Sequence, residues 1–300
     1  MTVAPSLDVG AFESYRPLLF GVAYRMLGSA SSADDMVQDA YLRAATAGAD
    51  EVRSLRSYLV TVVTRLCLDE LKSARRRRET YTGPWLPEPI PTDHEPLIED
   101  SIAERESISM AFMVLLERLG PVERAVFLLR EVFDYGYGEI ADVVCRSEAA
   151  CRQAFKRAKG RIEAGKRRFP ASRTEQAAMT VRFIEAASDG DLAGLIALQT
   201  DDIVAWSDGG GRVPSAINPI FGPSRVARFV RGLVAKSVAR GLLASFEMRE
   251  VNGELGIVWR DRRGRVSSVT VLEVAGGRIA AIRAVRNPQK LQRFGPPAGR

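Results

Sequence analysis

The sequence predicts a multidomain protein with two all-α units followed by a C-terminal α+β domain. At 300 residues the chain exceeds the size, about 250 residues, at which a single hydrophobic core stops growing. Apolar residues recur at spacings of three and four over residues 11–78 and again over 107–169, as amphipathic helices require. From about residue 174, one helical pattern precedes short alternating runs that are separated by turn residues.

The first helical unit ends in a strongly basic helix. Gly28 and Ser29 interrupt the first helical pattern, and a capping box is expected where Ser31 and Ser32 precede a pair of aspartates by three residues. The last helical pattern of this unit begins near Leu55 and finishes in the run Arg75 to Arg78.

Residues 79–106 differ from the helical segments on both sides. They contain five prolines, eight acidic residues and one arginine. Proline lacks the N–H donor and disfavours a helical residue before it, so this segment is expected to be an extended or turning linker.

The second helical unit carries a helix-turn-helix pattern. A short helix is predicted over 137–144, a break at 145–147 and a longer basic helix over 148–161. Ser147 stands at the natural N-cap position of the basic helix. In that helix Arg152, Gln153, Lys156 and Arg157 can face the major groove together, where Arg and Gln pair with guanine and adenine edges.

The C-terminal pattern predicts an α+β domain. A helix near 178–187 precedes strands at 203–206, 244–248, 256–259, 268–272 and 279–282. Turn pairs such as Asn252-Gly253 lie between the later strands, which favours an antiparallel meander.

The positive charge is concentrated in two helices. The net charge is +6, with six basic and two acidic residues between Arg65 and Arg78, and nine and two between Arg146 and Arg168. A single basic run is typical of a solvated helix face. Two runs, one of them inside a helix-turn-helix, favour a polyanionic partner such as duplex DNA.

Several classes of protein are not expected. Three cysteines in a long chain do not suggest a disulfide framework and indicate a reducing compartment. The single histidine, His94, and the lack of a Cys-x-x-Cys pair argue against structural zinc, and no cofactor is expected. Neither a signal peptide nor a membrane span is predicted, so a cytoplasmic location is expected.

The segments 32–44, 57–71 and 107–169 together resemble the extracytoplasmic-function (ECF) sigma factors, the promoter-reading subunits of bacterial RNA polymerase. The resemblance implies a non-enzymatic protein with sigma region 2 over 1–78, a linker over 79–106 and sigma region 4 over 107–169. Its implied partners are promoter DNA and core polymerase, through the β and β′ subunits. The implied polymerase contacts are Asp34, Asp35, Gln38 and Asp39. The implied −10 contacts lie in the loop 47–55 and on the helix 64–76, with Arg65, Lys72, Arg75, Arg76 and Arg77. The implied −35 contacts are Ser147, Arg152, Gln153, Lys156 and Arg157.

Further motifs resemble the subgroup of these sigma factors that carries a fused C-terminal SnoaL-like domain, here over 174–294. Trp85-Leu86-Pro87-Glu88-Pro89 matches the linker motif WLPEP, and Asp208-Gly209-Gly210-Gly211 matches DGGG. Asn287-Pro288-Gln289-Lys290-Leu291 resembles NPDKL, with Gln289 in place of the usual acid. The resemblance implies a cone-shaped barrel and an interdomain, regulatory role for these residues.

The C-terminal domain leaves several interpretations open. We expect it to regulate the sigma regions in cis in place of a separate anti-sigma protein, gripping the linker that Trp85 anchors. An acidic linker of this kind can also lie in a cationic channel that otherwise holds nucleic acid. Alternatives are a sensor with a small-molecule ligand in the C-terminal cavity, and a SnoaL-type enzyme with Asp208 as general base. Asp208 and its glycines also fit a loop that needs positive φ, and Trp206 and Trp259 fit a cavity wall or core.

Overall fold

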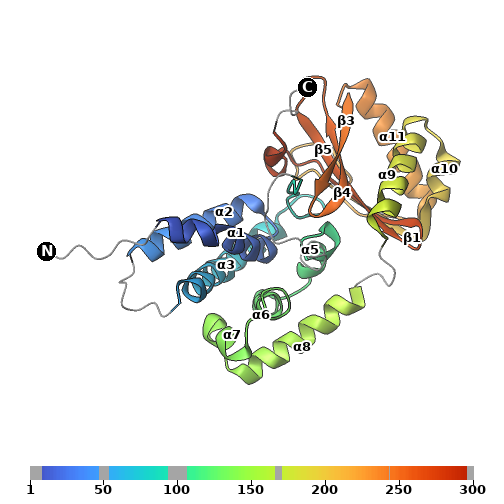
Figure 1. Ribbon diagram of the computed structural model, residues 1–300. Coiled ribbons are helices and arrows are strands. Elements are labelled where there is room, and N and C mark those ends of the chain that lie inside the picture. Colours follow the sequence, from blue (N-terminus) through green and yellow to red (C-terminus); the bar gives the residue numbers. More distant parts are fainter. Residues whose placement is uncertain (1–8, 47–53, 94–106, 166–170, 243, 296–300) are drawn as a thin grey trace. The chain divides into compact units, whose positions relative to one another are not determined.

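The computed structural model describes residues 9–46, 54–93, 107–165, 171–242 and 244–295 (Figure 1). The chain forms two compact units. The N-terminal unit comprises Met1–Glu79, Pro96–Ile108 and Phe112–Lys166. The C-terminal unit comprises Thr80–Glu95, Ser109–Ala111 and Arg167–Arg300, so the first half of the linker belongs to it.

The N-terminal unit begins with α1 (Val9–Leu27), α2 (Ala30–Thr46) and α3 (Leu55–Glu79), which confirms the predicted helices. Gly28 separates α1 from α2 with a φ of 65°, a backbone conformation that glycine adopts without strain. The predicted cap at Ser31 and Ser32 was wrong. The hydroxyl of Ser29 accepts the N–H of Ser32 at 3.2 Å, and α2 starts at Ala30 because this earlier serine satisfies one of the free N–H donors of its first turn.

The helix-turn-helix has the predicted form. It follows α5 (Met110–Leu116) and α6 (Pro121–Glu131) and consists of α7 (Tyr137–Val144) and α8 (Glu148–Gly165). The turn passes through Cys145 at a φ of 53°. Ser147 caps α8, because its hydroxyl accepts the N–H of Ala150 at 3.2 Å.

Contacts between α1, α3, α6 and α7 join the helices of the N-terminal unit into one body. The buried guanidinium of Arg124 on α6 donates to the carbonyl of Met26 at 2.6 Å and to Glu117 at 2.8 Å. Arg65 on α3 donates to the carbonyls of Asp142 at 2.7 Å and Val143 at 3.1 Å, both on α7. The helix-turn-helix therefore packs against the first helical bundle.

The C-terminal unit contains α9 (Arg173–Ser188), α10 (Leu192–Ala197) and α11 (Pro223–Ala239) beside one sheet (Figure 1). The strands are β1 (Gln199–Asp208), β2 (Ile220–Phe221), β3 (Ser245–Val251), β4 (Glu254–Arg260), β5 (Val266–Ala275) and β6 (Arg278–Val285). Their order is β2-β1-β6-β5-β4-β3, and β2 and β3 form the edges. This confirms the predicted α+β class.

The sheet differs from the predicted antiparallel meander in one pair. Strands β3 to β6 do form a meander, but β1 pairs with β6 in parallel. After β1 and β2 the chain passes through α11 to the opposite edge of the sheet, where β3 begins. The meander from β3 to β6 then runs back across the sheet, so its last strand, β6, lies next to β1. Short 3₁₀ turns, η2 (Pro288–Lys290) and η3 (Gln292–Phe294), follow β6.

The core of the C-terminal unit lies between the helices and one face of the sheet. Its buried members include Phe183 on α9, Val226 on α11 and Ile257 on β4. Strands β1 and β6 are parallel neighbours, and Ser207 pairs with Ala284 and Asp208 with Val285. The C-terminal ends of the two strands therefore lie side by side, and these ends carry the Asp-Gly-Gly-Gly and Asn-Pro motifs.

Candidate functional site

The acidic residues of α2 form an exposed row. Asp34, Asp35, Gln38 and Asp39 are all exposed, whereas Ala33, Val37 and Ala40 of the same helix are buried. Because residues three and four positions apart are neighbours on a helix surface, these side chains form one solvent-facing surface. This is the arrangement required of a contact surface for another protein.

The predicted −10 residues on α3 differ in their surroundings. Lys72 is 74% exposed and pairs with Asp69, its neighbour one turn away. Arg65 instead bonds the carbonyl groups of α7. The side chains of Arg75, Arg76 and Arg77 and the loop 47–53 lie outside the described residues.

The exposed face of α8 carries the residues predicted to read the −35 element. Arg152, Gln153, Lys156 and Arg157 are exposed, and Cys151, Ala154 and Ala158 are buried. Arg157 also donates to Glu123 of α6 at 3.0 Å. Burial alone would raise the pKa of Glu123, but bonds from Arg157 and the Gly120 N–H outweigh it and leave this pKa below its ordinary value.

The linker motif is held by the C-terminal unit at a buried carboxylate. Asp208, at the end of β1, is fully buried. Its Oδ2 accepts the backbone N–H of Leu86 at 2.9 Å, and its Oδ1 accepts the hydroxyl of Tyr81 at 2.5 Å. Burial and the bond to Asp208 raise the pKa of Tyr81. The carboxylate thus binds two points of the linker.

Lys290 completes this contact, which we call the linker clamp: Asp208, Asn287 and Lys290 with Tyr81 and Leu86. The ammonium of Lys290 bonds Asp208 at 2.8 Å and donates to the carbonyl of Leu86 at 2.5 Å. It also lies 4.2 Å from the ring centroid of Trp85, a cation–π distance. Both peptide groups that flank the Leu86 Cα are therefore bonded, and the buried ion pair is compensated by hydrogen bonds.

The glycines of the Asp-Gly-Gly-Gly motif allow close approach in the clamp. Asn287 donates to the hydroxyl of Tyr81 at 3.1 Å. A Cβ on Gly210 would lie 2.3 Å from the amide nitrogen of Asn287 and 2.9 Å from the Tyr81 hydroxyl, and Gly210 has a φ of 59°. Space and backbone conformation both require glycine here. Asp208 and its loop thus combine two of the roles considered from the sequence, a tight turn and a contact with the linker.

The linker continues along the edge strand β3. Pro87, Glu88 and Pro89 are buried, and Ile90 exchanges hydrogen bonds with Asn252, its N–H donating to the side chain at 3.0 Å and its carbonyl accepting at 2.9 Å. The N–H of Thr92 donates to the carbonyl of Glu250 at 3.0 Å. These contacts of Asn252 were not predicted from the sequence, which identified Asn252-Gly253 only as a turn.

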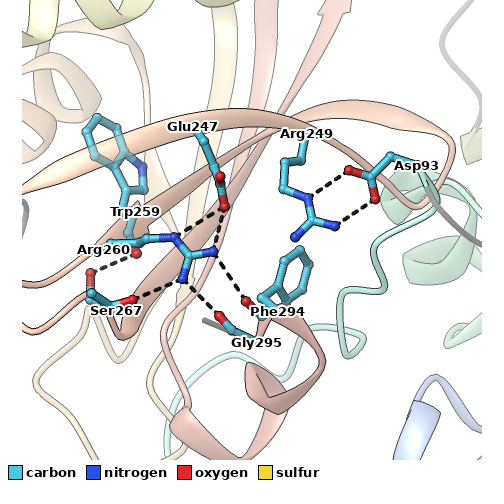
Figure 2. Close-up of polar contacts among 9 residues, drawn as sticks. Asp93, Glu247, Arg249, Trp259, Arg260, Ser267, Phe294 and Gly295 are labelled. Atoms are coloured by element: carbon cyan, nitrogen blue, oxygen red, sulfur yellow. Dashed lines mark hydrogen bonds and ion pairs between the residues drawn. The ribbon is translucent and has the colours of Figure 1, made fainter. Parts of the chain in front are cut away.

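A bidentate ion pair ends the described part of the linker (Figure 2). Arg249 donates to both carboxylate oxygens of Asp93, each at 2.8 Å. Phe294 lies beside Arg249, and its carbonyl and that of Gly295 accept from the buried Arg260. Arg260 is itself paired with Glu247 at 2.6 Å. The 3₁₀ turns after β6 are thereby fixed against β3 and β4, next to the linker.

Separate from the clamp, the C-terminal unit contains a partly open cavity of about 70 Å³. Trp206 and Trp259 line it, as one sequence interpretation expected, and Asp208 does not. The described cavity wall contains no histidine and no acidic residue. The arrangement that a general base in the cavity would require is therefore not present among these residues.

Three features together define the class of this protein: the acidic row of α2, the helix-turn-helix of α7 and α8, and the clamped linker. The class is that of a DNA-binding transcription protein with one contact region on each side of the linker. The Sigma-70 region 2 family matches residues 11–77, and the Sigma-70 region 4 family matches residues 109–162. The chain is 35% identical to the ECF RNA polymerase sigma factor SigJ of Mycobacterium tuberculosis over 98% of both chains. It is 28% identical to SigG of the same species, over 95% of this chain and 82% of that one.

The chain belongs to the ECF RNA polymerase sigma factors. The crystal structure of Mycobacterium tuberculosis SigJ matches this structure with a TM-score of 0.75 and 33% identity, over 95% of this chain and 98% of that chain. Region 2, region 4 and the C-terminal SnoaL-like fold are thus confirmed. As a sigma factor, the protein is a transcription regulator that binds core polymerase and promoter DNA rather than an enzyme. In the described part of the chain, no helix has the length and hydropathy that a membrane span requires.

Proposed function

We propose that this sigma factor binds the β and β′ subunits of core polymerase through the exposed acidic row of α2. Asp34, Asp35, Gln38 and Asp39 carry charge and hydrogen-bonding groups without internal apolar packing, which suits a polar protein interface. In the same proposal α3 contacts the −10 element with Lys72 and the arginines after it. The exposed face of α8 contacts the −35 element with Arg152, Gln153, Lys156 and Arg157.

The C-terminal domain regulates these contacts in cis by holding the linker. The observation that carries this proposal is the linker clamp, in which Asp208 and Lys290 bind both the N–H and the carbonyl of Leu86. Since the linker joins region 2 to region 4, fixing its first half restricts the placements that the two regions can adopt. A fused domain with this effect makes a separate anti-sigma protein unnecessary.

Binding of the linker in the clamp competes with its other proposed location, a cationic channel that otherwise holds nucleic acid. Glu88 is buried in the C-terminal unit, and Asp93 is paired with Arg249. Carboxylates held in this way are not available to a cationic channel of the polymerase. The linker therefore has two states, clamped and released, and polymerase shifts the balance only by its difference in affinity for them. We place this activity in the cytoplasm, where polymerase acts.

Reconstituted transcription tests this proposal. Purified chain and core polymerase are assayed on a promoter library, with the full-length chain compared with one truncated after residue 170. We expect RNA from a subset of templates and an output that changes at least severalfold on truncation. Equal RNA output from both chains would refute regulation in cis, and the absence of RNA on every template would refute the proposed promoter contacts.

A further inference from the structure

The cavity of the C-terminal unit is mainly apolar and lies between the helices and the sheet. Its volume is about 70 Å³, which admits the hydrocarbon part of a small organic molecule. Large apolar side chains in its wall include Phe183, Trp206, Phe229, Leu233, Leu242 and Trp259. Small pockets of this kind usually combine an apolar wall with a few polar groups that fix the orientation of a ligand.

Among the described residues, one cationic side chain lines this wall. Arg286 follows β6 and is half-buried, and burial lowers its pKa from the ordinary value. An arginine nevertheless keeps its charge at neutral pH. Within the described residues, the guanidinium of Arg286 donates to the carbonyl of Pro214 and contacts no carboxylate.

Neighbouring arginines of the same unit differ from Arg286 in this respect. Arg249 pairs with Asp93, Arg260 with Glu247, and Arg283 with Glu273. Taking a cation out of water is costly unless an anion compensates it. Arg286 is thus a partly desolvated cation without an anionic partner in the described structure, at the wall of an apolar cavity.

We propose that this cavity binds a small apolar carboxylic acid, whose carboxylate pairs with Arg286 and whose hydrocarbon part lies against Trp206 and Trp259. A guanidinium binds a carboxylate through parallel N–H donors, so the charge and the geometry of the arginine are both used. The apolar wall excludes larger or strongly hydrated anions.

Arg286 also connects the cavity to the linker clamp. This connection rests on the proposed function, in which the clamp regulates the sigma regions. The backbone N–H groups of Arg286 and Asn287 donate to the carbonyl of Asp208 at 2.7 and 2.9 Å. The side chain of Arg286 also bonds Pro214, in the loop after the Asp-Gly-Gly-Gly motif. A bound carboxylate that draws the guanidinium from Pro214 changes the support of Asp208, and with it the affinity of the clamp for the linker.

Titration calorimetry on the full-length protein tests the site, with isovalerate and benzoate as probes and the neutral amides isovaleramide and benzamide as controls. Each acid should bind at least tenfold more tightly than its amide. Arg286→Gln should remove this preference, and Arg286→Lys should restore part of it. Arg278→Gln changes an exposed arginine at the start of β6, away from the cavity wall, and should leave binding unchanged. Ser237→Leu, which fills the cavity, should abolish binding of the acids and the amides.

Circular dichroism first establishes that each variant is folded. Equal affinity for acid and amide, unchanged binding in Arg286→Gln, or no binding of either acid at millimolar concentration would overturn the proposed site. Transcription with and without the acid that binds then tests the connection to the clamp. If the acid binds and output does not change, the connection is wrong and the site stands. The truncation assay tests regulation in cis separately, because it needs no ligand.

Discussion

The backbone N–H of Leu86 donates to the fully buried carboxylate of Asp208 at 2.9 Å, across 122 positions of the sequence. The carbonyl of Leu86 accepts from Lys290, which is itself paired with Asp208. Because the clamp binds a peptide group on each side, it fixes the path of the linker and not only the position of one side chain. Trp85 and the buried prolines then add apolar area to a path that the backbone bonds define.

Removal of the buried carboxylate should destabilise the C-terminal domain and free the linker. In Asp208→Ala the ammonium of Lys290, whose side chain is 10% exposed, loses its anionic partner. Breaking a buried pair from one side costs about 3–5 kcal/mol. Urea unfolding should show a loss of this size, and hydrogen exchange should become faster at the Leu86 amide. Asp201→Asn, an exposed change on the same strand, is the control, and equal effects of both variants would contradict the role of the clamp.

Glu254 predicts a pH dependence of stability. Burial raises its pKa from 4.5 to about 7, although Arg283 and the Met110 N–H, which donates to Glu254 at 3.1 Å, oppose the shift. A raised carboxyl pKa favours the protonated folded form, so its contribution is complete below about pH 4.5 and is lost as the pH rises through 7. The loss is at most about 3 kcal/mol, since one pKa unit corresponds to about 1.36 kcal/mol.

Glu254→Gln checks this directly. The amide cannot ionise and still accepts the Met110 N–H, so the variant should gain stability relative to the parent at pH 8 and not at pH 4.5. The measurement is the urea midpoint across this range, with exposed Glu185→Gln as the control. A parallel pH profile for parent and Glu254→Gln would show that Glu254 ionises normally in the folded protein.

Lys72 and Arg65 should behave differently although both belong to the predicted −10 helix. Lys72 is exposed, so Lys72→Ala should weaken promoter binding by the polymerase complex and reduce its salt slope by about 0.7, as for one contact to single-stranded DNA. Arg65→Ala removes bonds to α7 and should lower the free energy of unfolding by about 1 kcal/mol. Fluorescence anisotropy over a salt series, together with urea unfolding, distinguishes the two. If Arg65→Ala instead weakened promoter binding and reduced the salt slope without a loss of stability, Arg65 would have to leave α7 to bind DNA.

On α8, Gln153 should contribute to sequence preference and Lys156 to general affinity. Both are exposed on the face opposite the buried Cys151, Ala154 and Ala158. Gln153→Ala should cost about 1–3 kcal/mol on the preferred −35 sequence and little on others, if its amide reads a base. Lys156→Ala should weaken all sequences alike. Competition binding with a set of single-base variants of the −35 element measures both effects.

The helical half of the structure was predicted well because its signals are local. Apolar spacing, Gly28 and Ser147 each act within one or two helical turns, and the helix-turn-helix followed from them. The capping serine was placed wrongly because Ser29, Ser31 and Ser32 are all suitable residues and only the backbone at Gly28 selects the first.

The C-terminal half depends on contacts between distant residues, which spacing does not show. The parallel pair of β1 and β6, the two-residue strand β2 and the helices α10 and α11 were not predicted. The motif resemblance indicated that Asp208, Lys290 and Leu86 act together, but Tyr81 and Asn252 carry no sequence signal for their contacts with Asp208 and the linker. Arg286 was also missed, because its isolation from acidic groups is visible only in the folded chain.

Promoter-directed transcription by core polymerase with the full-length protein, compared between the parent and Asp208→Asn, tests the central claim most directly. The substitution keeps the size of the side chain but removes the charge that holds Lys290 and the Leu86 N–H. We predict that RNA output from the preferred template changes at least fivefold, while circular dichroism shows a folded chain. An unchanged output from a variant whose Leu86 amide exchanges freely would show that the sigma regions work independently of the clamp.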